Sequence, residues 1–149
     1  MIARDLGLLV LRLAGLYLAV GHGWGKIVGL STGQSRFADG VANLGFPLPL
    51  LFAWAAALAE CAGGFAVAAG FLTRWAAAFA AATMSVAAFM QHHALSRFLS
   101  WIGVAPATED QLKAWGNPEL AVVYLLVMTG VGLIGPGRLS IDAKIGRER

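Results

Sequence analysis

Residues 47–74 read PLPLLFAWAAALAECAGGFAVAAGFLTR, and this stretch decides the fold class. Between the prolines at its start and Thr73-Arg74 at its end, the stretch is apolar apart from Glu60. About 20 predominantly apolar residues are enough for a helix to cross the hydrocarbon core of a bilayer. Residues 50–72 are therefore predicted to form a transmembrane helix that carries one carboxylate near its midpoint.

The composition of the whole chain extends this prediction. The 149 residues are 58% hydrophobic and 13% charged, whereas an ordinary soluble domain has about 25% charged residues. A chain of this length makes one domain, so residues 1–149 are expected to form a single domain in lipid. Binding of nucleic acid is not expected, because no basic stripe interleaves with exposed aromatic residues. The single cysteine, Cys61, excludes an internal disulfide and a Cys-x-x-Cys redox motif.

Three further apolar segments have the length of membrane spans, at about residues 6–27, 75–92 and 118–134. Together with the first one they predict an all-α, integral membrane bundle of four helices. The mixed segment 94–116 has apolar residues at helical spacing among polar ones, which predicts short interfacial helices between the third and fourth spans. Thr108, followed by two acidic residues, is expected to cap one of these helices.

The lysines and arginines predict the orientation of the bundle, because they are enriched on the cytoplasmic side of membrane proteins. With both termini inside, the inner surface carries Arg4, Arg12, Arg74, Arg138, Lys144, Arg147 and Arg149. The outer surface carries Lys26, Arg36, Arg97 and Lys113. Both termini are therefore predicted to lie in the cytoplasm.

Ionisable side chains inside the predicted spans are informative, because each costs about 2.5–3.5 kcal/mol near a helix centre. At about 100° per residue, Arg12, His22 and Lys26 fall on one side of the first helix. Glu60 shares its helix face with small residues, so it is expected to face another helix rather than lipid. A long arginine side chain could reach a carboxylate at mid-depth, and we predict a structural ion pair between Arg12 and Glu60.

Other polar groups are expected to gather in the outer half of the bundle. The first helix runs outward, so His22 and Lys26 lie near its outer end, and the third helix ends outward at His92 and His93. The predicted polar pocket contains His22, Lys26, Glu60, His92 and Glu119. Each of these residues could instead stabilise the bundle without binding a ligand. Cations at a helix C-terminus and acids at an N-terminus complement the helix dipole, and Glu60 is also the predicted partner of Arg12.

These residues, with their surroundings, resemble the DoxX family of small bacterial membrane proteins. The similar segments are Leu11-Arg12-Leu13 with Gly15, His22-Gly23 with Lys26, Asn43 to Pro47, Ala57 to Glu60 with Gly63-Gly64, Gly70 to Arg74, Pro118-Glu119-Leu120 and the tail Gly135 to Asp142. The resemblance covers nearly the whole chain and implies a four-helix protein of the bacterial inner membrane. Relatives include a subunit of a thiosulfate:quinone oxidoreductase and a component of another membrane oxidoreductase complex, so it also implies association with a redox complex.

Under the redox interpretation, the chain is a membrane subunit that binds a quinone or a similar lipid-soluble carrier. His22 and Lys26 would donate hydrogen bonds to a quinone carbonyl, and Glu60 or Glu119 would relay protons. A b-type haem held by His22 and His92 or His93 is a weaker alternative, because three histidines give no distinctive spacing. No metal site and no catalytic residue is indicated.

The chain carries no flavin or nicotinamide motif, so it is not expected to act as a stand-alone enzyme, and electrons would come from a partner or bound cofactor. The alternative function is a non-catalytic accessory subunit that stabilises or helps to assemble a larger membrane complex. In either case the expected partners are the lipid bilayer and other membrane subunits or further copies of the chain.

Overall fold

The computed structural model describes residues 2–34 and 36–146, which form helices and connecting turns without any β-strand. The predicted all-α class is confirmed. Arg147 and Arg149, two of the arginines assigned to the inner surface, lie outside the described residues.

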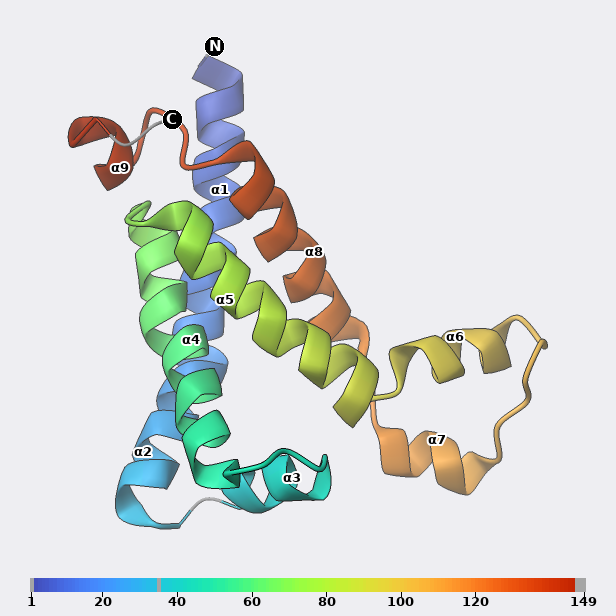
Figure 1. Ribbon diagram of the computed structural model, residues 1–149. Helices are drawn as coiled ribbons and strands as arrows, with labels where there is room; N and C mark the ends of the chain where they lie inside the picture. The colour runs from blue at the N-terminus through green and yellow to red at the C-terminus, as the bar shows by residue number, and fades with distance from the viewer. Residues whose placement is uncertain (1, 35, 147–149) are drawn as a thin grey trace.

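Four long helical segments coincide with the four predicted spans (Figure 1). The first consists of α1 (Ile2–Leu18), the π-helical η1 (Ala19–Gly23) and α2 (Trp24–Thr32). The second is α4 (Pro49–Ala69), and the third is α5 (Thr73–Ser85) continued by the π-helical η2 (Val86–Gln91). The fourth is α8 (Glu119–Ile134). In space α1 packs against α4, α4 against α5, α5 against α8, and α8 against α1.

Two of these segments, Ala3–Thr32 and Pro49–Ala69, are long and apolar enough to cross a membrane. A third span results if α7 (Glu109–Trp115) and α8, which meet at a bend of 47°, count as one. The described part of the chain therefore holds two or three candidate spans. The crossing of a bilayer by all four long helices stays a prediction.

The helix ends follow the proline and glycine signals in the sequence. Pro49 stands at the first position of α4, where a missing N–H costs nothing. Gly70 ends this helix in the left-handed conformation, with φ of 72°. At the start of α8, the Asn117 side chain accepts a hydrogen bond from the backbone N–H of Glu119 at 2.9 Å. Gly135, with φ of 95°, ends α8 as predicted.

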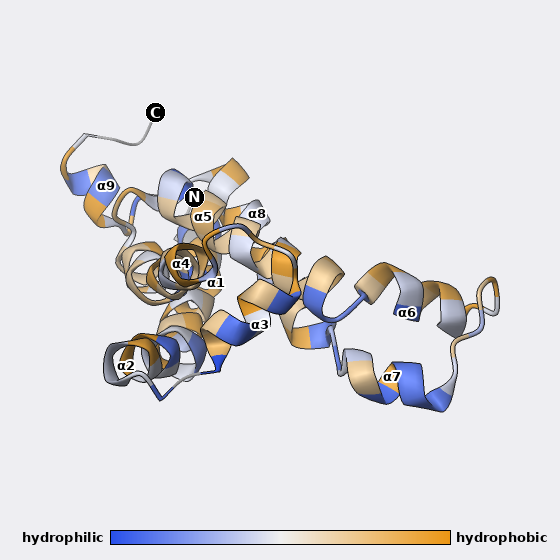
Figure 2. Cartoon of the chain, turned by 60° about the horizontal axis from the view of Figure 1, so that its bottom comes forward, coloured by the Kyte–Doolittle hydropathy of each residue, from blue (hydrophilic) through white to orange (hydrophobic). Residues whose placement is uncertain are grey.

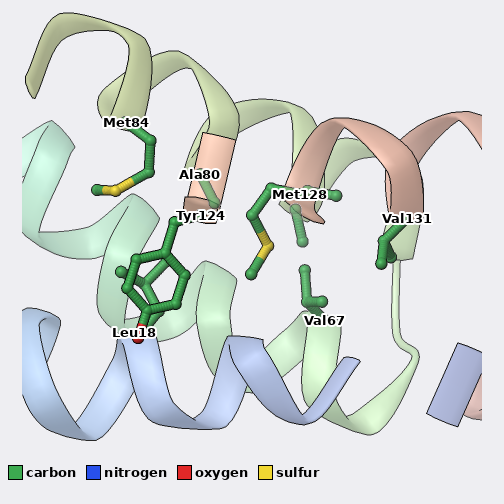
Figure 3. Packing of buried hydrophobic residues seen from close by; sticks show 9 residues of the cluster. Leu18, Val67, Ala80, Met84, Tyr124, Met128 and Val131 are labelled. Atoms are coloured by element: carbon green, nitrogen blue, oxygen red, sulfur yellow. The ribbon is translucent and has the colours of Figure 1, made fainter. Parts of the chain in front are cut away.

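The core lies where α1, α4, α5 and α8 meet, and its side chains are seen in Figure 3: Leu18, Val67, Ala80, Met84, Tyr124, Met128 and Val131. The first long segment and α4 approach each other so closely that the glycines at their contact have no room for a side chain. A Cβ atom at Gly64 would lie 2.5 Å from the carbonyl oxygen of Gly15, and one at Gly23 would lie 2.4 Å from the backbone nitrogen of Cys61. These glycines fix which residues of the two antiparallel helices lie opposite each other.

Residues 2–34 and 36–146 also form four shorter helices outside this core. Of these, α3 (Phe37–Asn43), which was not predicted, lies beside the start of α4, and α9 (Ile141–Lys144) follows α8. The predicted helices between the third and fourth long segments are α6 (Ala94–Trp101) and α7. They form an arm that extends away from the other helices (Figures 1 and 2). The predicted cap of α7 is confirmed, because the Thr108 side chain accepts a hydrogen bond from the backbone N–H of Gln111.

Candidate ligand-binding pocket

A cavity of about 640 Å³ lies between α2, α3, α4 and the α5–η2 segment. Its wall is mostly apolar and includes the rings of Phe37, Phe46, Phe52 and Phe79 beside alanines of α4 and α5. The polar lining residues are Lys26, Arg36, Glu60, Thr83, Gln91 and His92. Sites for small molecules have about this volume, about 300–1,000 Å³, and the same combination of apolar walls with a few polar groups.

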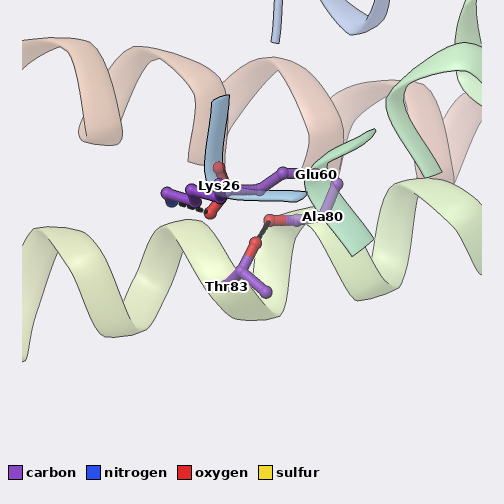
Figure 4. A network of polar contacts seen from close by, with 4 residues as sticks. All are labelled: Lys26, Glu60, Ala80 and Thr83. Atoms are coloured by element: carbon purple, nitrogen blue, oxygen red, sulfur yellow. Dashed lines mark hydrogen bonds and ion pairs between the residues drawn. The ribbon is translucent and has the colours of Figure 1, made fainter. Parts of the chain in front are cut away.

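An ion pair between Lys26 and Glu60 forms the charged part of this wall. Nζ of Lys26 lies 2.5 Å from Oε1 of Glu60 (Figure 4). Glu60 is 2% exposed and Lys26 is 26% exposed, so the pair is largely withdrawn from solvent. The ammonium group also lies 4.5 Å from the ring centroid of Phe37, which is a favourable cation–π distance. The pair compensates both charges and holds Lys26 at the edge of the cavity.

The second carboxylate oxygen of Glu60 has a different environment. Oε2 is buried and has no hydrogen-bond partner among the described residues. The hydroxyl group of Thr83 lines the same cavity, but it donates to the carbonyl oxygen of Ala80 in its own helix at 2.9 Å (Figure 4). A buried acceptor without a donor costs about 1–3 kcal/mol, and more when it is charged. Glu60, a lining residue of the cavity, thus keeps one acceptor oxygen that no donor among the described residues satisfies.

Three of the five predicted pocket residues, Lys26, Glu60 and His92, line one cavity. Nδ1 of His92 lies 2.8 Å from the carbonyl oxygen of Trp115, which holds the ring in place. His22 does not line the cavity and meets the ring of Tyr124 edge-on, with the centroids 5.9 Å apart. Glu119 is exposed at the start of α8 and also lies outside the lining.

The predicted ion pair between Arg12 and Glu60 is not formed, since Glu60 pairs with Lys26. Arg12 is 1% exposed and donates a hydrogen bond to the carbonyl oxygen of Leu139, while Asp142 lies near enough to attract its charge. The packing of α1 on α4 explains the error. Gly23 lies opposite Cys61, so the level of Glu60 along the first helix is near Lys26 and about three turns from Arg12.

The π-helical η1 interrupts the α-helical spacing between Arg12 and Lys26. A π turn closes its hydrogen bonds over five residues and so contains one residue more than an α turn. One extra residue rotates all following side chains by about 100° about the helix axis. The prediction that Arg12, His22 and Lys26 share one side of the first helix assumed α-helical spacing throughout, whereas η1 lies between Arg12 and Lys26. Both side chains nevertheless lie on the side of α4, because Lys26 pairs with Glu60 and the guanidinium group of Arg12 lies beside Gly70 at the C-terminal end of that helix.

A second buried polar cluster, which the sequence did not predict, lies at the opposite end of α4. The carboxylate of Asp142 accepts hydrogen bonds from the backbone N–H groups of Leu72 and Thr73, both at 2.9 Å, and from the Thr73 hydroxyl at 2.7 Å. The backbone N–H of Asp142 donates to the carbonyl oxygen of Gly70 at 2.8 Å. With Arg12 beside it, this cluster fastens the C-terminal segment to the start of α5 and to α1.

The helical architecture, the apolar spans and the buried lysine–carboxylate pair define a small membrane protein with an internal amphipathic pocket. The sequence model of the DoxX family matches residues 7–93, which is more than half of the chain. The protein belongs to the DoxX family of membrane proteins, as the resemblance predicted.

Two Escherichia coli proteins are similar over nearly the whole chain. Inner membrane protein YqjF is 32% identical over 145 residues, which cover 97% of this chain and 96% of the relative. Inner membrane protein YphA is 28% identical over 144 residues, which cover 95% of this chain and 92% of the relative. No solved structure matches the chain at a significant level.

Proposed function

We propose that this protein is an inner-membrane subunit that binds a quinone or a similar lipid-soluble carrier for a redox complex. The observation that carries the proposal is the buried pair of Lys26 and Glu60 in the wall of a mostly apolar cavity of about 640 Å³. A bound quinone would supply the capacity to carry electrons and protons. The chain would hold the ring among phenylalanines and direct a donor, the ammonium group of Lys26, toward a ring oxygen.

The position of the apolar lining supports a ligand that comes from the lipid phase. Phe52 on α4 and Phe79 on α5 line the cavity and are also exposed on the surface of the chain. These helices meet at the turn after Gly70 and diverge toward the ends where α3 and η2 lie (Figure 1). A ligand dissolved in the bilayer would therefore reach the charged pair without crossing water. Glu60 and His92 are the lining groups that would exchange protons with it.

Filling the cavity is expected to remove the bound carrier. Ala59→Phe places a ring into the space beside Glu60, whereas Ala62→Phe, on the same helix, places it on an exposed face outside the lining. The quinone content per protein, measured by chromatography of extracted lipid after purification, should fall about tenfold or more in the first variant, as a loss of about 1.4 kcal/mol implies. It should be unchanged in the second. If the unaltered protein retains no more quinone than Ala59→Phe, the proposed function is wrong.

We also propose that all four long helices cross the inner membrane, with both termini in the cytoplasm and the α6–α7 arm at the outer surface. The distribution of lysine and arginine supports this orientation, and the similarity to two inner membrane proteins supports the location. The arm exposes Leu95, Phe98 and Trp101, and Trp101 is 82% exposed. Aromatic and aliphatic side chains beside polar ones are typical of a helix that lies in the headgroup region.

Alkaline phosphatase, which is active only outside the cytoplasm, tests this orientation. Fusions that end after Gly103 in the arm are expected to be active. Fusions after Arg74 or after Gly146 are expected to be inactive, because both positions lie on the predicted inner side. Enzyme activity in whole cells, corrected for the amount of fusion protein, is the measurement. High activity of the Gly146 fusion would contradict the four-span arrangement.

A further inference from the structure

We infer that the pocket selects ligands that carry a hydroxyl donor on the ring, so that of a quinone couple it binds the dihydroxy form in preference to the dicarbonyl form. The inference rests on the proposed function and adds the specificity of its site. It follows from the two oxygens of Glu60, of which one is paired and the other is not.

Oε2 of Glu60 becomes an acceptor for a ligand when the side chain turns this oxygen toward the cavity. Oε1 is held by Lys26, and Oε2 is buried without a hydrogen-bond partner among the described residues. Two uncharged polar residues of the cavity wall are engaged elsewhere, because Thr83 donates to the carbonyl oxygen of Ala80 and Nδ1 of His92 lies against the carbonyl oxygen of Trp115. Glu60 is 2% exposed, so bulk water does not compensate this oxygen.

A hydroxyl group and a carbonyl group differ in what they offer to this wall. An ammonium group has three N–H donors, and the carboxylate of Glu60 takes one of those of Lys26. A ligand hydroxyl could donate to Oε2 of Glu60 and accept from Lys26 at the same time. A ligand carbonyl could only accept from Lys26 and would bring a second acceptor next to Oε2. A hydrogen bond to a charged group contributes about 1.5–3 kcal/mol, which corresponds to about 10–100-fold in affinity.

Three ligands with one ring system test the selection: menadione, its reduced form menadiol, and the dimethyl ether of menadiol, which lacks only the hydroxyl donors. Binding of each ligand to the full chain in nanodiscs is measured anaerobically by isothermal titration calorimetry. Empty nanodiscs give the background from partition into lipid. Menadiol is expected to bind about 10–100-fold more tightly than the other two ligands.

Variants then assign the selection to Glu60. In Lys26→Met with Glu60→Met, the pair is replaced by apolar side chains of similar length, and the preference for menadiol should fall below about threefold. Glu60→Gln, which keeps the shape and offers both a donor and an acceptor, should also reduce it. Glu119→Gln is the matched control, because this carboxylate lies outside the cavity, and it should keep the full preference.

The outcomes separate this inference from the proposed function. Equal binding of the three ligands, or tighter binding of menadione, would overturn the inference and leave a quinone-binding pocket. No binding above empty nanodiscs for any ligand would overturn both. A preference for menadiol that persists in the double variant and in Glu60→Gln would show that another group selects the hydroxyl, and would also overturn the inference.

Discussion

Asp142→Ala is expected to lower the free energy of unfolding by about 1–3 kcal/mol, the usual cost of leaving a buried hydrogen-bond donor without its acceptor. Asp142 is 3% exposed and Arg12 is 1% exposed, so the substitution takes a nearby negative charge away from a buried guanidinium group. It also removes the acceptor for Leu72 and Thr73 at the start of α5. Denaturant titration of the purified protein in detergent measures the effect.

Two comparisons make this prediction specific. Asp142→Asn keeps an oxygen acceptor without the charge, so its loss of stability should be intermediate. Asp39→Ala removes an exposed carboxylate on α3 and should change stability by less than about 0.5 kcal/mol. Cleavage by trypsin after Arg138 and Lys144 should also become faster in Asp142→Ala, because the C-terminal segment loses its attachment. A variant as stable as the unaltered protein would contradict the role assigned to this cluster.

Gly64→Ala is expected to cost about 1–3 kcal/mol, the range observed when extra atoms are forced into a packed core. The added Cβ would lie 2.5 Å from the carbonyl oxygen of Gly15 and 3.0 Å from the backbone nitrogen of Ala19. Backbone atoms cannot rotate away as a side chain does, so α1 and α4 must separate. Unfolding in detergent, followed by circular dichroism, gives the size of the effect.

The control for this substitution is a glycine in an open environment. Gly25 lies in α2, and a Cβ added there meets no atom within 4 Å. Gly25→Ala should therefore raise stability by about 0.5–1 kcal/mol, because alanine loses less backbone freedom in a helix than glycine does. If both substitutions stabilise the protein to a similar degree, the close packing of α1 on α4 is not the constraint described here.

The sequence predicted the long helices well, because their signals are local. Runs of apolar residues and the punctuation at Pro49, Gly70 and Gly135 are each contained within a few neighbouring positions. The inward position of Glu60 was also predicted from its own helix, where small residues share its face, and its burial confirms it. Such features depend on one helix at a time.

The partner of Glu60 depends on two helices at once, and here the sequence prediction was wrong. Helical spacing within one helix cannot reveal the register between two helices, which Gly23 and Gly64 set here. The role of Asp142 was missed for a similar reason, since its contacts with Leu72 and Thr73 join distant segments. A local signal was present, because Ser140 caps α9 by accepting a hydrogen bond from the backbone N–H of Ala143, and it marked a helix in the tail.

The aromatic part of the pocket was missed as well. Phe37 and Phe46 belong to α3 and the turn that follows it, in a segment too short and too polar to be recognised as part of the fold. Phe52 and Phe79 looked like ordinary lipid-facing residues of two spans. Only the divergence of α4 and α5 brings these rings around one space.

The attachment of Arg12 has a consequence for how the protein is made. The carbonyl group that accepts its hydrogen bond, in Leu139, is 127 positions later in the chain. A ribosome therefore delivers the first helix to the membrane well before the segment that compensates its buried cation has been synthesised. Until then the arginine must stay near lipid headgroups or water. The last step of assembly would draw it inward, so that a truncated translation product lacking the tail would be recognisable to quality-control proteases.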